Sequence, residues 1–124
     1  MRLNHANIVT GDVAALARFF IRHFAFEQVA MRGKDAFAIL RGADGFDLNL
    51  MKPGKGEAAA YPEGWHVGFV VTNPDEVRAK HAELETAGYA PGAVQRLARG
   101  DTATVTFYCR APGGLLVEVC ASAN

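Results

Sequence analysis

The chain has 124 residues, half of them hydrophobic and 21% charged, with 13 basic and 13 acidic side chains. A chain of this length can bury roughly two thirds of its unfolded surface, so it can fold as one compact domain without disulfides or a structural metal. The zero formal net charge leaves no broad basic face for nucleic acid or an anionic membrane. No apolar run approaches the ~20 residues of a membrane span, and the start of the chain lacks a signal-peptide pattern. We therefore expect a cytoplasmic protein that binds neither nucleic acid nor membranes.

The first half of the chain reads as a strand, a helix and three more strands. Alternation of apolar and polar residues predicts a strand over residues 3–9. Asp12 then caps a helix that presents Val13, Leu16, Phe20 and Phe24 on one face and ends near residues 24–26. Glycine-containing turns separate three further predicted strands, which cover residues 26–31, 36–40 and 46–51.

The same order is predicted again after a loop over residues 52–64 that is rich in glycine and proline. A strand over residues 65–71 leads to a helix opened by Asn73, with Val77, Leu84 and Ala87 facing inward and Gly88 at its C-cap. Strands over residues 93–97, 103–109 and 115–121 complete the second half. The sequence thus predicts an α+β fold in one domain, residues 1–124. Two βαβββ modules, about 1–52 and 64–124 with a linker over 53–63, are expected to form an open, curved mixed β-sheet barrel with the helices outside.

The two halves also resemble each other locally, as expected for a duplicated unit. His5 and His66 begin matching segments that each run into a capped helix, and aligned glycine turns set Asn49 opposite Glu118. Side chains alternate along a strand, so Asn49, His66 and Glu118 lie opposite the bulky apolar rows of their strands. The first strand is the weak case, because both of its rows are similarly apolar. Placing the first and last strands of both halves at the sheet centre would bring these four side chains to one axis.

These residues include three good metal ligands. Glu118 stands between Val117 and Val119, and a buried carboxylate in such surroundings needs a partner. Two histidines and one carboxylate leave open positions on a divalent ion such as iron, manganese, zinc, nickel or cobalt, and the sequence does not choose among them. The alternative is that the histidines are ordinary satisfied residues and Glu118 is an edge-strand charge facing water.

The whole pattern resembles the vicinal oxygen chelate superfamily, which includes glyoxalase I, extradiol dioxygenases, fosfomycin-resistance enzymes and bleomycin-binding proteins. The resemblance is carried by Leu3-Asn4-His5, by Gly64-Trp65-His66-Val67-Gly68-Phe69, and by Phe107-Tyr108-x2-Ala111-Pro112-Gly113-Gly114-x3-Glu118. It implies that His5, His66 and Glu118 are the ligands of a divalent metal. It also implies a homodimer whose sites can draw on both chains, and a small-molecule substrate.

The resemblance leaves the reaction open. Glyoxalase I has a glutamate at the fourth ligand position, whereas Asn49 is neutral and cannot act as a general base. The C-terminal motif fits part of the extradiol dioxygenase signature, but its preceding histidine is replaced by Arg99-Gly100-Asp101. Dioxygenase, lyase and thiol transferase chemistry on an oxygen-rich substrate all remain. The alternative is a metal-free antibiotic-binding resistance protein that sequesters an aromatic ligand with Trp65, Tyr61 and phenylalanines.

Other side chains are candidates for the same cavity. A hairpin turning at residues 112–114 predicts Tyr108 near Cys120 and Arg110 near Glu118, so that Tyr108 either donates a hydrogen bond to an oxygen on the metal or packs at the rim. Cys109 and Cys120 have opposite parity, and we expect both to be reduced core thiols. Basic residues near strand ends that are candidates for holding an anionic substrate, unless simply solvated, are Arg41, Lys52, Arg96 and Arg99.

Overall fold

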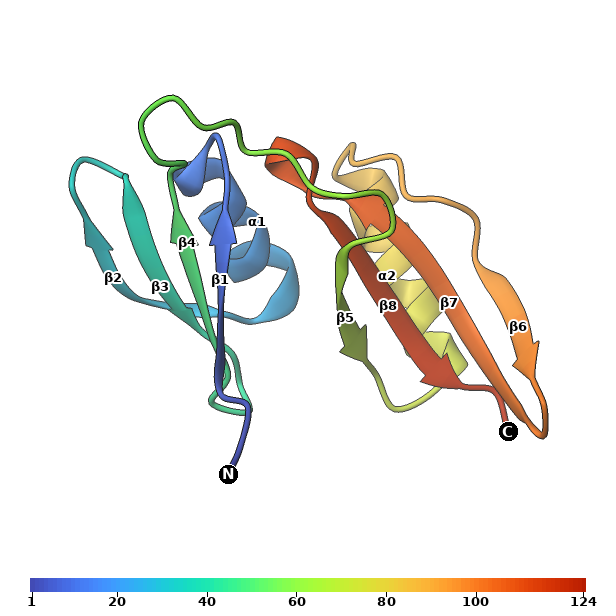
Figure 1. Ribbon diagram of the computed structural model, residues 1–124. Helices are drawn as coiled ribbons and strands as arrows, with labels where there is room; N and C mark the ends of the chain where they lie inside the picture. The colour runs from blue at the N-terminus through green and yellow to red at the C-terminus, as the bar shows by residue number, and fades with distance from the viewer. The chain divides into compact units, whose positions relative to one another are not determined.

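The computed structural model describes all residues from 1 to 124, which divide into two compact units, residues 1–61 and 62–124 (Figure 1). We call them the N-module and the C-module. The N-module consists of β1 (His5–Val9), α1 (Val13–Phe24), β2 (Glu27–Arg32), β3 (Phe37–Arg41) and β4 (Asp47–Met51). The C-module consists of β5 (His66–Val70), α2 (Pro74–Thr86), β6 (Gln95–Arg99), β7 (Thr102–Arg110), the short 3-10 turn η1 (Pro112–Gly114) and β8 (Leu116–Ser122). The predicted α+β class and the repeated βαβββ order are confirmed.

Each module contains one mixed four-stranded sheet, with the strand orders β1-β4-β3-β2 and β5-β8-β7-β6. The first and last strands of each module pair in parallel, and the other neighbours are antiparallel. In the parallel pairs, Asn7 lies opposite Asn49 and Gly68 lies opposite Glu118. The modules therefore correspond strand for strand, and the predicted correspondence of Asn49 with Glu118 is confirmed.

Side-chain caps define where both helices begin. The Asp12 carboxylate accepts a 3.0 Å hydrogen bond from the Ala15 amide, and the Asn73 side chain accepts one of 3.0 Å from Glu76. Such caps satisfy amides that have no partner within the helix. Gly88 follows α2 with φ of +90°, a conformation that residues other than glycine rarely adopt. The predicted start of each helix and the glycine after the second are thus confirmed.

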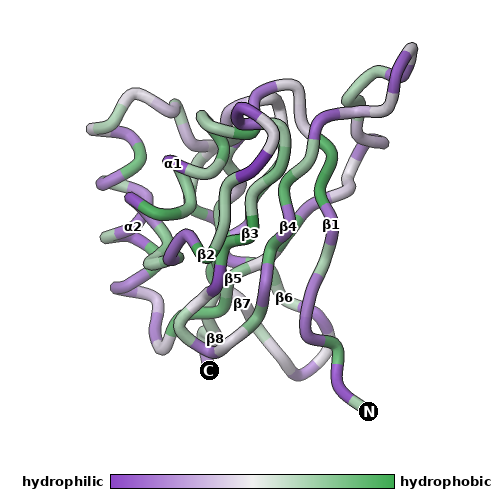
Figure 2. The backbone as a smooth tube through the Cα atoms, turned by 90° about the vertical axis from the view of Figure 1, so that its left-hand side faces the viewer, coloured by the Kyte–Doolittle hydropathy of each residue, from purple (hydrophilic) through white to green (hydrophobic).

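One face of each sheet is covered by the helix of its own module. Helix α1 packs on β2, β3 and β4, and α2 packs on β7 and β8. Figure 2 shows that β1 and β4 carry both hydrophobic and hydrophilic residues, as expected for strands with two unlike faces. Ile8 is only 1% exposed, whereas His5 and Asn7 of the same strand are exposed. This settles the ambiguous first strand, because Ile8 faces the core and His5 faces the open side.

One prediction about an inward-facing residue is wrong. Ala87 is exposed, because α2 reaches the core mainly through Val77 and Leu84, and Ala87 is already the C-cap. Trp65, which precedes the edge strand β5, is 41% exposed. Neither helix is long and apolar enough to cross a membrane.

Candidate functional site

The open face of the C-module sheet brings His66 and Glu118 together. His66 begins β5, and Glu118 lies in the middle of the adjacent β8. Their side chains are 34% and 18% exposed, with His66 Nε2 and Glu118 Oε2 3.1 Å apart. Val117 and Val119, which flank Glu118, point to the opposite face and are buried. Strand alternation thus puts the carboxylate on the open face, as the sequence predicted.

The hydrogen bond of the other imidazole nitrogen of His66 determines which nitrogen carries the proton. Its Nδ1 lies 2.7 Å from the Gly64 carbonyl oxygen, which can only accept a hydrogen bond. The proton is therefore assigned to Nδ1. At 3.1 Å from a carboxylate oxygen, Nε2 then carries a second proton or leaves its lone pair for a cation. This donor set fits a divalent metal: two ligands of one ion lie roughly 3 Å apart, and metal-binding histidines commonly donate their second N–H to a carbonyl.

Thr106 on β7 holds the second oxygen of Glu118. The Thr106 hydroxyl donates to Glu118 Oε1 at 2.7 Å and also lies 3.1 Å from the Val119 carbonyl oxygen. Thr106 is fully buried. No sequence motif indicates Thr106. The signal that could have found it is its parity, because Thr106 and Tyr108 are two residues apart on one strand and therefore share a face.

Tyr108 lies directly opposite Glu118 in the β7–β8 pairing, and its ring meets the His66 ring edge to face with centroids 5.4 Å apart. Burial, with Glu118 contributing, raises the pKa of the Tyr108 phenol above its ordinary value, while Arg99 opposes the shift. The phenol therefore remains a neutral O–H donor at neutral pH.

The predicted register of this hairpin is wrong by two residues. Cys120 pairs with Thr106 rather than Tyr108, and Arg110 pairs with Leu116, with its guanidinium donating to the Gly114 carbonyl. The reason is the turn: Ala111 N–H bonds to the Leu115 carbonyl at 2.8 Å. This closes the hairpin tightly around η1.

A cavity of about 290 Å³ lies over this face of the C-module sheet. We call it the C-module cavity; it is lined by His66, Leu97, Arg99, Thr104, Thr106, Tyr108, Glu118 and Cys120. Both cysteines are free, as predicted, but only Cys109 is a buried core thiol, because Cys120 lines the cavity. Burial raises the pKa of both thiols, and the charge of Glu118 adds to the effect at Cys120.

The corresponding face of the N-module holds His5 among different partners. His5 Nδ1 lies 2.8 Å from Asn4 Oδ1, and the Asn49 amide donates to Asn7 Oδ1 at 2.8 Å. Asp47 accepts two 2.8 Å hydrogen bonds from Arg41. Within each module, no three His, Cys, Asp or Glu side chains are grouped so that they could hold a metal ion. The C-module thus supplies two of the three predicted ligands, and His5 belongs to the N-module.

The four basic candidates have different surroundings. Arg41 is engaged by Asp47. Arg96 pairs with the buried Val105, on the helix side of the sheet, whereas Arg99 lines the C-module cavity. Lys52 follows β4 in the N-module.

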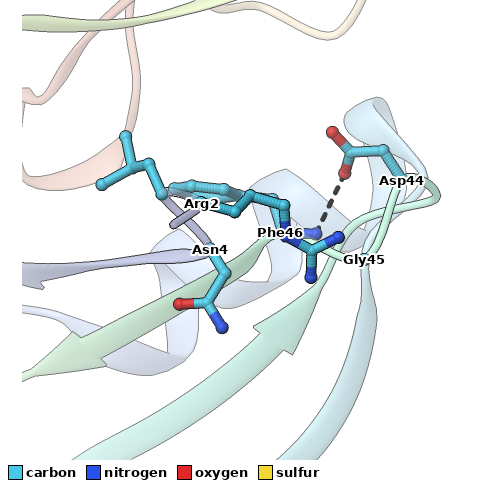
Figure 3. A pocket seen from close by; sticks show the side chains of 6 residues that line it. Arg2, Asn4, Asp44, Gly45 and Phe46 are labelled. Carbon is cyan, nitrogen blue, oxygen red and sulfur yellow. Dashed lines mark hydrogen bonds between the residues drawn. The ribbon is translucent and has the colours of Figure 1, made fainter.

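The N-module has a smaller hollow of about 80 Å³ beside its first residues. Figure 3 shows that Asp44 there turns back onto the backbone N–H of Phe46, a hydrogen bond of 3.1 Å. Arg2 and Asn4 also line this hollow. The Asp44 carboxylate in this hollow thus holds the turn that leads into β4.

Comparison with known proteins agrees with this architecture. The family model of the Glyoxalase/Bleomycin resistance protein/Dioxygenase superfamily matches residues 2–119. Among solved structures, the chain is similar to that of a "possible Glyoxalase" from Bacillus cereus, with 34% sequence identity and a TM-score of 0.80 over 96% of this chain and 97% of that chain. No curated protein matches the sequence.

Two more distant structures share the fold. Lactoylglutathione lyase from Agrobacterium tumefaciens is 19% identical, with a TM-score of 0.74 over 97% of this chain and 92% of that chain. The genomically encoded fosfomycin resistance protein FosX from Listeria monocytogenes is 17% identical, with a TM-score of 0.76 over 98% and 93%. Because the family model covers residues 2–119, the protein belongs to the glyoxalase/bleomycin resistance/dioxygenase superfamily, the family that its sequence motifs indicated.

Proposed function

We propose that the protein is a metal-dependent enzyme of this superfamily that acts on a small, oxygen-rich substrate. His66 and Glu118 are the ligands from the C-module, and His5 is the third. When bound, a divalent ion supplies Lewis-acid chemistry, polarising two neighbouring oxygens of the substrate and offsetting negative charge that develops on one of them. Dioxygenase, lyase and thiol transfer reactions share this requirement.

The observation that carries the proposal is the arrangement of His66 between an acceptor and a carboxylate. His66 Nδ1 donates its proton to the Gly64 carbonyl oxygen, and Glu118 Oε2 faces Nε2 at 3.1 Å. An uncharged Nε2 lone pair beside a carboxylate is unfavourable, so the site favours a cation at this point. His5, which corresponds to His66 in the N-module, is exposed on the open face of its own sheet.

The remaining cavity residues serve the substrate. Tyr108 holds its proton and donates a hydrogen bond to a substrate oxygen, which stabilises charge developing there. Thr106 keeps the Glu118 carboxylate in one orientation. Asn49 is hydrogen-bonded to Asn7 and has no carboxylate to offer, so general base catalysis from this position, as in glyoxalase I, is not part of the proposal.

Metal titration of the full chain tests the proposal. Elemental analysis after purification without chelator gives the native ion, and the visible ligand-field absorption of bound Co²⁺ reports the ligands. We expect His5→Ala, His66→Ala and Glu118→Ala each to weaken metal binding by at least about 100-fold, since each removes one of three ligands. The matched control is His81→Gln, because His81 bonds the Gly92 carbonyl on the helix side of the C-module. Tyr108→Phe should retain the metal and lose turnover.

The opposite result identifies the alternative function. A protein that binds no metal, with an unchanged melting temperature in iron, manganese, nickel, cobalt or zinc, would be a metal-free binding module for an antibiotic or another small molecule. Retention of metal by His5→Ala alone would remove His5 from the ligand set.

The expected homodimer can be tested with the same variants. Mixing His5→Ala with Glu118→Ala restores metal binding only if sites are built from two chains, because a mixed dimer then contains one intact set of ligands. If each site lies within one chain, both partners remain defective after mixing.

A further inference from the structure

The C-module cavity has unlike ends. The register across the sheet places β5 and β8, which carry His66 and Glu118, on one side and β6, which carries Arg99, on the other. Arg99 pairs with Thr102, which is six residues, or roughly 20 Å of strand, from Tyr108 on β7. Nevertheless, the Arg99 side chain lines the same cavity as Tyr108 and Glu118. Arg99 therefore lies at the β6 end of the cavity.

No carboxylate of the C-module neutralises Arg99. The ion pairs of this module join His66 with Glu118, Asp75 with Arg78, and Lys80 with Glu83. Glu118, the single carboxylate lining the cavity, is already held by His66 and Thr106. Asp101, two residues after Arg99, forms no ion pair with it.

The other lining groups complement an anion rather than a cation at this end. Thr104 offers a hydroxyl, Tyr108 offers a phenol, and Leu97 supplies an apolar wall. A guanidinium presents a planar fork of N–H donors that matches carboxylate and phosphonate oxygens. Hydroxyl groups can donate to the remaining oxygens.

We propose that Arg99 binds an anionic group of the substrate, so that the C-module cavity takes a small molecule with a carboxylate or phosphonate at one end and neighbouring oxygens at the other. That the bound molecule is a substrate rests on the proposed function, in which its neighbouring oxygens lie at the His66–Glu118 end of the cavity. The anion site itself needs no metal. Arg99 determines which molecules enter the cavity, and it takes no part in proton transfer.

The test is anion binding to the full chain in the presence of chelator, measured by NMR. The probes are methylphosphonate, acetate and acetamide; acetamide is the neutral counterpart of acetate. We expect both anions to bind and to shift the Arg99 side-chain N–H signal and the Thr104 and Thr106 amide signals. Acetamide should not produce these shifts. A preference between the two anions indicates which oxyanion the substrate carries.

Variants of two neighbouring arginines make the test specific. Arg99→Gln should weaken the affinity for the anions about tenfold, the effect of losing a charge-assisted hydrogen-bonded pair at an accessible site. Arg99→Lys should keep part of the affinity. Arg96→Gln is the matched control, since Arg96 lies on the same strand but on the opposite face, and it should change the affinity less than about twofold. Retained amide spectra confirm that each variant is folded.

The proposal is wrong if the wild-type protein does not bind the anions, or if Arg99→Gln binds them as tightly as wild type. It is also wrong if Arg96→Gln lowers the affinity for the anions as much as Arg99→Gln does. These outcomes are separate from failure of the proposed function. Arg99→Gln should bind Co²⁺ as wild type does, whereas Glu118→Ala should lose Co²⁺. If the protein binds anions through Arg99 but binds no metal, the anion site is supported and the proposed metal-dependent function is wrong.

Discussion

Thr106 Oγ1 lies 2.7 Å from Glu118 Oε1 and 3.1 Å from the Val119 carbonyl oxygen, so one buried hydroxyl is shared between a side chain and the backbone of β8. The opposite carboxylate oxygen faces His66 at 3.1 Å. Glu118 thus has a neighbour at each oxygen, one on each side of its strand, and the Thr106 hydrogen bond orients Oε1 without a bound ion.

Replacing Thr106 with valine removes the hydroxyl while preserving shape and strand propensity. We expect Thr106→Val to lower the free energy of unfolding by about 1 kcal/mol, the usual net value of a hydrogen bond, and to weaken metal affinity at least about tenfold, as outer-shell substitutions do. Urea denaturation and Co²⁺ titration measure the two effects. Thr104→Val is the control, because Thr104 shares the face and the strand but makes no bond to Glu118. Equal behaviour of both variants would contradict the assigned role.

Gly68 lies opposite Glu118 in the β5–β8 pairing and has no side chain that could contact the carboxylate. A Cβ added at Gly68 would lie 3.6 Å from Glu118 Oε2, an ordinary contact, and its backbone is not in the left-handed region. The corresponding pair in the N-module is Asn7 with Asn49, joined by a hydrogen bond. We expect Gly68→Ala to bind metal nearly as wild type does and Gly68→Asn to fold but lose most of its metal affinity, because its amide can donate to Glu118. Metal titration beside amide NMR spectra tests this, and full metal affinity in Gly68→Asn would refute it.

Asp47 gives a pH-dependent contribution to stability. The hydrogen bonds from Arg41, opposed in part by desolvation and aided by charge, lower the pKa of Asp47 below its ordinary value of 3.8. A carboxyl group whose folded pKa is lowered stabilises the fold above its unfolded pKa, and this stabilisation disappears as the pH falls through the folded value. The melting temperature of wild type should therefore exceed that of Asp47→Asn slightly at neutral pH, and the two should converge in acid.

The ion pair is exposed, so the neutral-pH difference should be small and should shrink in high salt. Arg41→Gln should show the same convergence, because it removes the other partner of the pair. Asp35→Asn, at an exposed aspartate without an ion pair, serves as the control. A constant difference between wild type and Asp47→Asn at all pH values would show that the charge of Asp47 does not stabilise the fold.

Helix α2 depends on few buried contacts. Its buried residues are Val77 and Leu84, and Leu84 is fully buried. We expect Leu84→Ala to lower the free energy of unfolding by about 3 kcal/mol, from lost burial and the cavity it leaves. Thermal and urea unfolding measure the loss. The neighbouring exposed Glu85→Ala should change stability by less than about 0.5 kcal/mol, and a similar loss in both variants would contradict this packing.

Much of the architecture followed from local patterns. Alternation along the strands, capping side chains at Asp12 and Asn73, and the repeated order of elements predicted two βαβββ modules. Parity alone placed His66 and Glu118 opposite the apolar rows, because in a strand the face of a side chain depends only on its position along the chain. The glycine turns before β4 and β8 predicted the correspondence of Asn49 with Glu118.

Parity does not specify which residues are partners across the sheet, and the tertiary structure decided this. A face is set by alternation, but the partner across the sheet is set by the backbone of the turn, and the tight closure of Ala111 on Leu115 moved Tyr108 opposite Glu118. The face of His5 is determined by the burial of Ile8 in the core, and burial against a helix is a non-local contact that the strand's own sequence does not specify. Likewise, Thr106 became a site candidate only through its hydrogen bond to Glu118. Arg99 was one of four basic candidates in the sequence, and only the folded sheet separated it from the other three by placing it at the C-module cavity.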